Sequence, residues 1–497
     1  MSSLQSGACL RPRFRAAITR AFVSARAMLS IGALYFARML TPTRGSRLAK
    51  LGGALGALLA MTHAAVAQVP PKPDSTARDS LVVSVDSLAA RLARAEAAIA
   101  LLQQQLATEA SAAVRTRSRF QLELSARVLS NSYFTSGRTN SAELPLFVRD
   151  PATPPGGSIG SAGTGALGMT LRQTLLGAAI SVDSVLGATF VGDIDIDFFA
   201  GGTAYTADPF GFPEMRLRTV NAQLRWTNTT LMIGTDTPLI SDLNPVSLAA
   251  VGTSGFATAG NLWNWIPQMR ISRTVTRAVL RNTPVSFALH AAALAPALGV
   301  DHAAESDGID AGERAARPAL QGRMSVQWGP SDANDDARGE IGIGAHRGWA
   351  RVSGDTLMST HAIAVDAHVG LSRGVSLLGE AYTGRAISAL GGGGIGQLFG
   401  APDVGSVLGA PVRDVAGWAQ LNAQLRPSVT TGAGCGLAVA DARDRPRRRR
   451  NGSCEAHLIW RPTQPVLVGL EVRRLRTSYA TGSYRATHVN LAVGFEW

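Results

Sequence analysis

The sequence lacks most marks of an enzyme or a metalloprotein. Only three cysteines and two lysines occur among 497 residues, the eight histidines are scattered, and no H-E-x-x-H zinc motif is present. Metal and catalytic sites depend on clustered ligands or nucleophiles. The sequence therefore predicts no catalytic residue, no metal site and no other cofactor, and we expect a protein that is not an enzyme.

Long apolar runs are also missing, with one exception near the N-terminus. Leu51–Val69 is apolar, follows basic residues and contains the small-residue site Ala65-Val66-Ala67. This order predicts a secretory signal peptide that is cleaved after Ala67, and the alternative is a membrane anchor helix. Residues 1–67 are longer than a signal peptide needs, which indicates an over-extended start before Met39 or, alternatively, a transit peptide.

The net charge of +13 does not indicate nucleic-acid binding. Nine of the 48 basic residues and none of the 35 acidic residues lie in residues 1–67. The remainder holds 39 basic and 35 acidic residues, a net charge of about +4. A nearly neutral chain has no electrostatic reason to bind nucleic acid.

Residues 68–114 predict a linker and then a helix. Residues 68–79 are rich in proline and polar residues, as in a tether. Residues 80–114 lack glycine and proline, and their apolar seam alternates spacings of four and three at Leu81, Val85, Leu88, Leu92, Ala95, Ile99, Leu102 and Leu106. This seam predicts a coiled coil and hence an oligomer, for which a trimer fits the rest of the chain. The alternative is an amphipathic helix packed on a globular core.

From residue 119 onward the apolar period changes to two. Sixteen alternating segments begin near residues 119, 165, 185, 214, 229, 267, 284, 318, 338, 360, 374, 415, 429, 453, 465 and 485. The last one has apolar residues at every second position from Val489 to the terminal Trp497. Residues 119–497 therefore predict a 16-stranded antiparallel transmembrane β-barrel, preceded by the short α-helical coiled coil. An edge strand of a soluble β domain is the alternative for the last segment.

The links between these segments alternate between long loops and short turns. This alternation places both chain ends in the periplasm, so it predicts a barrel in the bacterial outer membrane with a periplasmic coiled coil. The third long loop, Pro238–Ile266, is the candidate constriction of a water-filled channel, and Asp242, Trp263 and Trp265 are its candidate functional residues. Alternatively, it is a surface loop with both tryptophans in an outer aromatic girdle.

Alternation also predicts which charged residues line the lumen. Asp193, Asp195 and Asp197 share one face, and three stacked acids repel one another unless cations lie opposite. The cations with inward parity are Arg127, Arg172, Arg225, Arg270, Arg323 and Arg473. Arg216 and Arg218 reach the lumen only through a bulge or from beyond the membrane. These residues predict a charged, pore-lining eyelet that selects solutes, and the alternative is an ion-pair ladder that stiffens the wall.

Two features concern the outer end of the predicted barrel. Cys435 and Cys454 lie on adjacent segments with matching parity, which predicts a cross-strand disulfide in an exported protein. Arg447–Arg450 lies in the seventh long loop at the outer mouth. It is either a solvated charge cluster or a site that binds lipopolysaccharide phosphates or attracts anions.

The order of signal peptide, coiled coil and barrel resembles the DcaP-like porins, a group of trimeric bacterial porins. The segments that carry the resemblance are Gly168–Thr174 (GMTLRQT), Ile194–Ala200 (IDIDFFA), Pro213–Leu224 (PEMRLRTVNAQL), Leu231–Thr237 (LMIGTDT) and Pro267–Ser272 (PQMRIS). The resemblance implies a sixteen-stranded trimer that passes small anionic solutes, including dicarboxylates, with Arg172, Arg218 and Arg270 as lumen cations. The Ala- and Gly-rich third loop and the nearly neutral chain depart from this pattern.

Together these observations predict an outer-membrane porin. We expect a homotrimer for passive diffusion of small hydrophilic, anionic solutes such as dicarboxylates, in contact with outer-membrane lipid and lipopolysaccharide. The alternative is a structural or adhesive outer-membrane barrel that its coiled coil tethers to the cell envelope.

Overall fold

The computed structural model describes residues 113–115, 120–151, 165–200, 214–298, 308–329, 339–352, 356–406 and 408–497. The predicted signal peptide (1–67), the linker (68–79) and residues 80–112 of the predicted coiled coil lie outside the described residues. The structure assigns Ala113–Arg115 to a short strand, β1. Ala113 and Val114, the last two residues of the predicted coiled coil, are therefore in a strand and not in a helix. The chain divides into two units at Val114 and Arg115, and the larger one contains the β-barrel.

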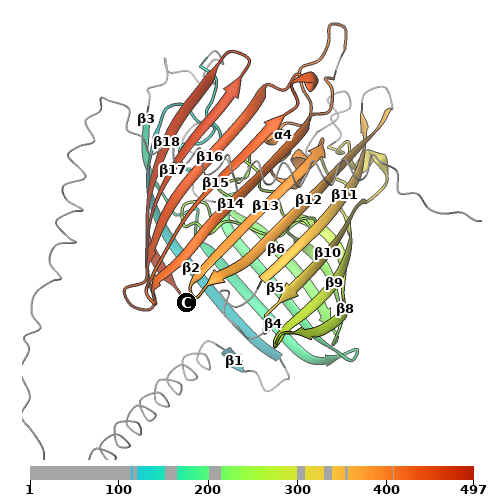
Figure 1. Ribbon diagram of the computed structural model, residues 1–497, viewed down its shortest axis with the longest axis vertical. Coiled ribbons are helices and arrows are strands. Elements are labelled where there is room, and N and C mark those ends of the chain that lie inside the picture. Colours follow the sequence, from blue (N-terminus) through green and yellow to red (C-terminus); the bar gives the residue numbers. More distant parts are fainter. Residues whose placement is uncertain are drawn as a thin grey trace, which may run out of the picture. The chain divides into compact units, whose positions relative to one another are not determined.

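The barrel is a closed antiparallel sheet of 16 strands (Figure 1). Its first half consists of β2 (Phe120–Ser136), β3 (Gly165–Thr170), β4 (Leu175–Val185), β5 (Ala188–Ala200), β6 (Glu214–Arg225), β7 (Thr229–Asp236), β8 (Ile266–Leu280) and β9 (Thr283–Leu294). Its second half consists of β10 (Ala319–Trp328), β11 (Gly339–Val352), β12 (Thr356–Ser372), β13 (Val375–Arg385), β14 (Arg413–Arg426), β15 (Val429–Ala440), β16 (Arg448–Trp460), β17 (Val466–Tyr479) and β18 (Ser483–Glu496).

Two pairings explain the count and the closure. Both β3 and β4 pair with β2, so they form one strand that is interrupted at residues 171–174. The last strand, β18, pairs with β2 from His488 opposite Thr135 to Glu496 opposite Arg127. This pairing leaves no free edge, and the predicted 16-stranded antiparallel barrel is confirmed.

Alternating side chains give the barrel an apolar outer face and a polar inner face. On β18, Leu491 and Val493 are 44% and 46% exposed on the outside, whereas His488 and Asn490 point inward and are buried. Three tryptophans at the short-turn end are exposed, as in an interfacial aromatic girdle: Trp226, Trp460 and Trp497. Among the described residues, no helix has the length and apolar content needed to cross a bilayer.

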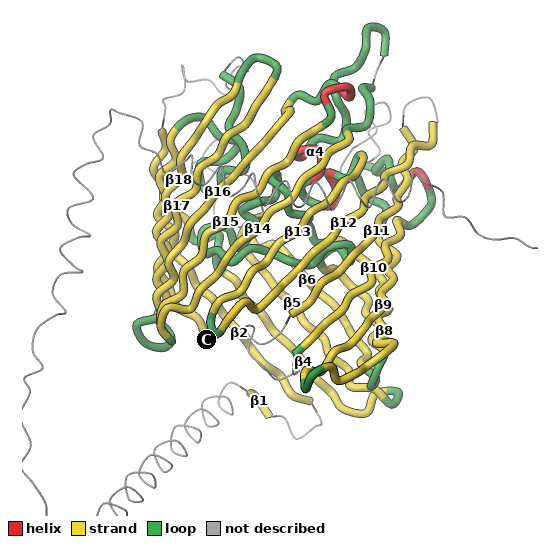
Figure 2. Tube along the Cα trace, viewed as in Figure 1, coloured by secondary structure: helices red, strands yellow, loops and turns green. Residues whose placement is uncertain are grey.

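The two ends of the barrel differ in their connections. Tight turns such as 186–187, 281–282 and 373–374 lie at the end that holds the C-terminus, and loops such as 237–265 and 386–412 lie at the other end (Figures 1 and 2). The loops contain short helices: η2 (Glu313–Ala315), η4 (Ser388–Leu390), α4 (Gly393–Gly396) and η5 (Ala442–Asp444).

The largest apolar core lies inside the barrel. Leu239, Ile240 and Leu262 of the loop 237–265 pack with Ile387 and Ile395 of the loop 386–412. Inward-facing residues of β9–β15 complete this cluster, among them Ala292, Ala364, Tyr382 and Ala416. The two loops are therefore folded elements of the lumen.

Candidate functional site: the lumen wall that faces the inner loop

Residues 237–265, called the inner loop here, run inside the barrel (Figure 2). Hydrogen bonds attach this loop to strands far from β7, where it begins. Ile240 N donates to Gln321 Oε1 on β10 (3.0 Å), Val246 N donates to Gln420 Oε1 on β14 (2.7 Å), and Leu248 O accepts from Asn131 Nδ2 on β2 (2.8 Å). The loop thus crosses the lumen and packs on the wall of β10–β18, and it touches the β4–β9 wall where Gly252 O accepts from Arg216 Nη2 on β6 (2.5 Å).

Inward-facing glycines let the loop backbone lie directly on the wall. A Cβ atom at Gly436 on β15 would lie 2.2 Å from the carbonyl oxygen of Ala259. A Cβ atom at Gly344 on β11 would lie 2.7 Å from the carbonyl oxygen of Ile240. Any larger residue at these positions would push the inner loop away from the wall.

A buried ion-pair triad fixes the loop on β16 and β17. Arg473 donates to Glu455 (2.9 Å) and to Glu471 (2.7 Å), and it also donates to the carbonyl oxygen of Gly255 in the loop (3.2 Å). Ser247 of the loop donates to the second oxygen of Glu471. Arg473 has 0% exposed surface, so the inner loop covers this predicted pore-lining residue and separates it from the lumen.

A β-bulge on β6 brings two arginines to one carboxylate. Asp195 pairs with Thr219 and Asp197 pairs with Arg216, so Arg218 is the extra residue between them. Without the bulge, alternation from Val220 would point Arg216 outward. The extra residue turns Arg216 inward. Arg216 Nη2 lies 2.6 Å from Asp197 Oδ2, and Arg218 Nε lies 3.6 Å from the same oxygen. Asp197 has no exposed surface, whereas both arginines are partly exposed.

Aromatic rings stack with these guanidinium groups. Trp265 at the end of the inner loop lies under Arg218 (4.6 Å from ring centroid to Cζ) and Arg216 (5.0 Å). Phe199 on β5 lies under Arg216 (5.5 Å) and Arg172 (4.4 Å). The two rings hold the three guanidinium groups in one cluster, which we call the arginine–aromatic cluster (Arg172, Phe199, Arg216, Arg218 and Trp265).

The wall changes charge toward the short-turn end. Below the cluster, Asp195 accepts from Thr219 (3.2 Å) and Asp193 accepts from Asn221 (2.9 Å). Arg225 follows near the end of β6 and donates to Gln223 (2.9 Å). A solute that moves along this wall therefore meets guanidinium groups, then carboxylates, then another guanidinium group.

A second charged group lies farther around the barrel. Arg323 on β10 pairs with Asp366 (2.5 Å) and Glu340 (2.7 Å), and its Nη2 lies 4.0 Å from Asp242 of the inner loop. The Arg323 side chain is 3% exposed, whereas that of Asp242 is 41% exposed. Asp242 is therefore the member of this group that solvent in the lumen reaches.

The remaining candidate residues also point into the barrel. Arg127 pairs with Glu496 (2.9 Å) near the short-turn end, and Arg270 lies 3.7 Å from Asp236. Arg172 lies at the interruption between β3 and β4, where it pairs with Glu143 of the first long loop (2.9 Å). Trp263 packs edge-on against Trp265 and donates to the carbonyl oxygen of Gly391 (2.7 Å), so neither tryptophan belongs to an outer girdle.

The alternation of side chains predicts which residues face inward, but not which of them are buried or which acids they bind. Asp197, Arg323 and Arg473 face inward but are almost fully buried, because their ion-pair partners and the inner loop cover them. Three buried acids were not predicted: Glu143, Glu455 and Glu380, which accepts from Asn261 of the inner loop (2.8 Å). Inward parity marks Glu455 and Glu380 in the sequence, whereas no periodic signal marks Glu143, which lies in a loop.

The other two predicted features lie on β15 and β16 and beside the loop between them. Cys435 pairs with Cys454 across β15 and β16, and their sulfur atoms are bonded. Their parity places this disulfide on the outer face of the barrel. Within Arg447–Arg450, Arg448 turns toward the mouth, donates to Ile395 O (3.1 Å) and lies 4.2 Å from the Phe147 ring centroid.

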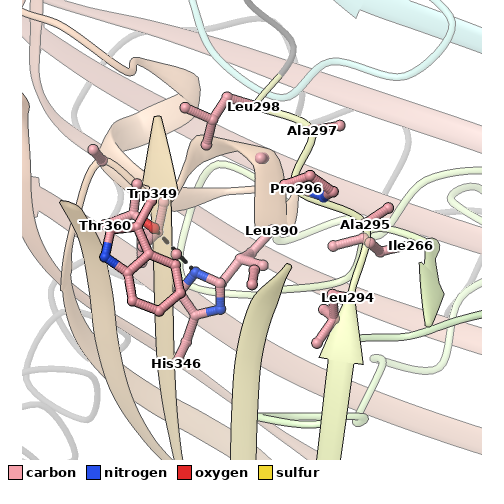
Figure 3. Close-up of a pocket in the computed structure, with 15 residues that line it drawn as sticks. Ile266, Leu294, Ala295, Pro296, Ala297, Leu298, His346, Trp349, Thr360 and Leu390 are labelled. Atoms are coloured by element: carbon pink, nitrogen blue, oxygen red, sulfur yellow. Dashed lines mark hydrogen bonds between the residues drawn. The ribbon is translucent and has the colours of Figure 1, made fainter. Parts of the chain in front are cut away.

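An enclosed cavity near the top of β9–β12 is too small for a solute. It has a volume of about 20 Å³, room for one water, and its lining includes Leu294, His346, Thr360 and Leu390 (Figure 3). His346 Nε2 and Thr360 Oγ1 lie 3.2 Å apart and satisfy each other. Among the described residues, no group of three or more His, Cys, Asp or Glu side chains is arranged to hold a metal ion.

Comparison with solved structures establishes the fold. The outer-membrane channel DcaP of Acinetobacter baumannii matches with a TM-score of 0.57 and 17% sequence identity, over 78% of this chain and 100% of that chain. The chain has the fold of DcaP. The resemblance to DcaP-like porins that the short motifs indicated is thus confirmed for the fold, which is a porin-like channel barrel. At 17% identity this likeness does not show which solutes the chain passes.

Other matches are more distant. The anion-selective porin from Comamonas acidovorans matches with a TM-score of 0.46 and 12% identity, over 76% of this chain and 100% of that chain. OmpT of Vibrio cholerae matches with a TM-score of 0.46 and 8% identity, over 77% of this chain and 99% of that chain. No model of a known protein family and no curated protein matches the sequence.

Proposed function

We propose that the protein is a bacterial outer-membrane porin for passive diffusion of small hydrophilic solutes, with a weak preference for anions such as dicarboxylates. The arginine–aromatic cluster is the observation that carries this proposal. Three guanidinium groups face one fully buried carboxylate, that of Asp197, and the carboxylate of Glu143, which is also buried. The solvent-exposed charge at this height is therefore positive, where the inner loop meets β5 and β6.

Guanidinium groups suit carboxylate solutes for geometric reasons. A guanidinium group presents a planar fork that matches a carboxylate, and stacking on an aromatic ring reduces the side-chain entropy that binding would remove. Asp193 and Asp195 below the cluster oppose tight binding of an anion. A weak, multi-step interaction of this kind favours passage over retention.

The location in the outer membrane follows from the outer face. Its strands expose apolar residues such as Leu491 and Val493, the barrel has no free edge, and tryptophans mark the short-turn end. Such a surface is stable in hydrocarbon and not in water. The first residue of β2, Phe120, and the C-terminal Trp497 then lie on the periplasmic side. The coiled coil that the sequence predicts for residues 80–114 supports assembly into a homotrimer.

Planar bilayer recordings test the proposal. We expect stepwise conductance and, in a KCl gradient, a reversal potential that indicates modest Cl⁻ preference. Replacing Arg216 and Arg218 by glutamine should shift the reversal potential toward K⁺ and weaken the reduction of current by a four-carbon dicarboxylate. The matched control is Arg225→Gln on the same strand, which leaves the cluster intact and should produce a smaller shift.

Two results would contradict the proposal. A native protein that favours K⁺ would refute the anion preference. A protein that inserts but gives no conductance steps would refute the channel, and it would favour a structural or adhesive role in which the apolar core of the inner loop and residues 386–412 closes the barrel.

A further inference from the structure

A groove runs along the outer face of the barrel at the long-loop end. It has a volume of about 620 Å³ and lies over β7, β8 and β9 beneath residues 313–318. Ile233, Met269 and Ala293 form its apolar floor, and Arg317 and Glu313 lie at its polar side. Ile233 and Met269 are 55% and 56% exposed, so the floor is open to the surroundings of the barrel.

Cations continue from this groove across the neighbouring strands. Arg317 and Arg347 flank the ring of Trp349, with their Cζ atoms 6.0 Å and 5.9 Å from its centroid. Arg347 pairs with His361 on β12, and His361 pairs with Arg385 on β13. Their inward neighbours His346, Ala362 and Gly384 are buried, so these side chains are on the outer face.

Three arginines of the row have no anionic partner in the part of the chain that the structure describes. Like charges on facing residues of neighbouring strands, about 4.8 Å apart, destabilise a sheet. The next residue of the row, Arg413, pairs with Asp444 (2.6 Å). Within the described part of the chain, no carboxylate forms an ion pair with Arg317, Arg347 or Arg385. Glu313, the acid beside the groove, instead accepts from the backbone N–H of Asp310 (2.9 Å).

We propose that this surface binds a phosphorylated lipid of the outer leaflet. A phosphate group would bind between Arg347 and Arg385 with His361 as a further donor, or between Arg347 and Arg317 over Trp349. A hydrocarbon chain would cover the apolar floor formed by Ile233, Met269 and Ala293. The proposal rests on the proposed outer-membrane location, and it concerns the outer face, whereas solute selection concerns the lumen.

The combination of features selects this partner. A free anion would have no use for an apolar groove, and a purely apolar chain would leave three arginines without counter-ions. Tryptophan beside arginine at the edge of an apolar band is typical of the level where lipid headgroups lie. Because each phosphate carries negative charge, the headgroup removes the repulsion along the row and should stabilise the barrel.

Binding to the full-length, detergent-solubilised protein tests the proposal. The probes are lipid A with its phosphates, the same lipid after phosphate removal, and inorganic phosphate, with binding followed by native mass spectrometry and by the thermal unfolding midpoint. We expect the phosphorylated lipid alone to bind and to raise the midpoint. In the variant Arg347→Ala/Arg385→Ala its affinity should fall by about tenfold or more.

The matched control removes the same charge elsewhere. Arg273 on β8 and Arg474 on β17 are exposed on the outer face, away from β11–β13, and Arg273→Ala/Arg474→Ala should leave lipid binding within about twofold of the native value. Conductance should be unchanged in both variants, because neither alters the lumen. Loss of lipid binding with intact conductance, or the converse, therefore separates this proposal from the porin function.

Four results would overturn the proposal. Equal binding of the dephosphorylated lipid would show an apolar site only, and binding of inorganic phosphate alone would show a free-anion site. Equal losses in the two double variants would show unspecific attraction of charge. A change of oligomeric state in Arg347→Ala/Arg385→Ala would show that the surface is an interface between copies of the chain.

Discussion

Arg216 and Asp197 form an ion pair of 2.6 Å across β6 and β5, in which the carboxylate is fully buried and the guanidinium group is partly exposed. This asymmetry determines the charge that a solute meets. Asp197 holds Arg216 and Arg218 together but contributes no surface of its own, so the pair presents a positive face to the lumen.

Removal of this carboxylate should increase anion preference and reduce stability. In Asp197→Asn, two guanidinium groups lose their shared counter-ion, so the lumen becomes more positive and the cluster loses about 1–3 kcal/mol of interaction free energy. The reversal potential in a KCl gradient should move toward Cl⁻, and the thermal unfolding midpoint should fall. Asp195→Asn is the control for stability, because Asp195 bonds the neutral Thr219; a larger fall of the unfolding midpoint there would contradict the role of Asp197.

Trp265 should restrict the positions of both arginines. Its ring lies 4.6 Å and 5.0 Å from the two Cζ atoms, and each such contact contributes about 0.5–2 kcal/mol. Trp265→Ala should widen the passage, raise single-channel conductance and weaken dicarboxylate binding in the lumen. Trp460→Ala removes an exposed tryptophan of the outer face and serves as control. Unchanged conductance in Trp265→Ala would exclude a constriction at this height.

The buried Arg473 should hold the inner loop in place. In Arg473→Met, Glu455 and Glu471 stay buried without a cation, which costs about 3–5 kcal/mol. We expect a lower unfolding midpoint, protease cleavage within residues 237–265 and noisier single-channel currents. The triple variant Arg473→Met/Glu455→Gln/Glu471→Gln removes all three charges and should recover much of the stability. Equal instability of both variants would show that the ion pairs are not what fixes the loop.

The sequence predicted the barrel because each strand follows one rule. A period of two decides which face of a strand meets lipid, and the closed ring follows from sixteen such segments with alternating link lengths. Arg216 shows where this rule stops. Its parity is outward when counted from Val220, and only the bulge at Arg218 reverses it, which depends on pairing with β5 and not on the segment alone.

The course of the inner loop was less predictable, because parity gives a face and not what covers it. Arg473 has the predicted inward orientation, yet the loop buries it. One unused signal was present. Gly344, Gly436 and Gly469 are inward-facing glycines on three strands of one wall, and the inner loop approaches all three. Glycine on the inner face of a wide barrel indicates close approach of another backbone.

The outer loop between β15 and β16 should open in acid without unfolding of the barrel. Hydrogen bonds from the Arg443 side chain and backbone lower the pKa of Asp441 to about 2, and Arg413 lowers the pKa of Asp444 in the same way. A carboxyl group whose pKa is lower in the folded loop than its ordinary value of 3.8 stabilises the loop above that value. Its contribution is lost as the pH falls toward about 2. Because the Arg443–Asp441 pair is exposed and both acids lie in the loop, acid affects the loop and not the strands of the barrel. A spin label at the exposed Ala442 should therefore become more mobile between about pH 4 and pH 2, while the circular dichroism of the strands stays constant.

Asp441→Asn removes the acceptor charge, so a label at Ala442 in this variant should already be mobile at neutral pH and change little on acidification. A label that stays immobile at pH 2 in the native loop would show that other contacts hold it.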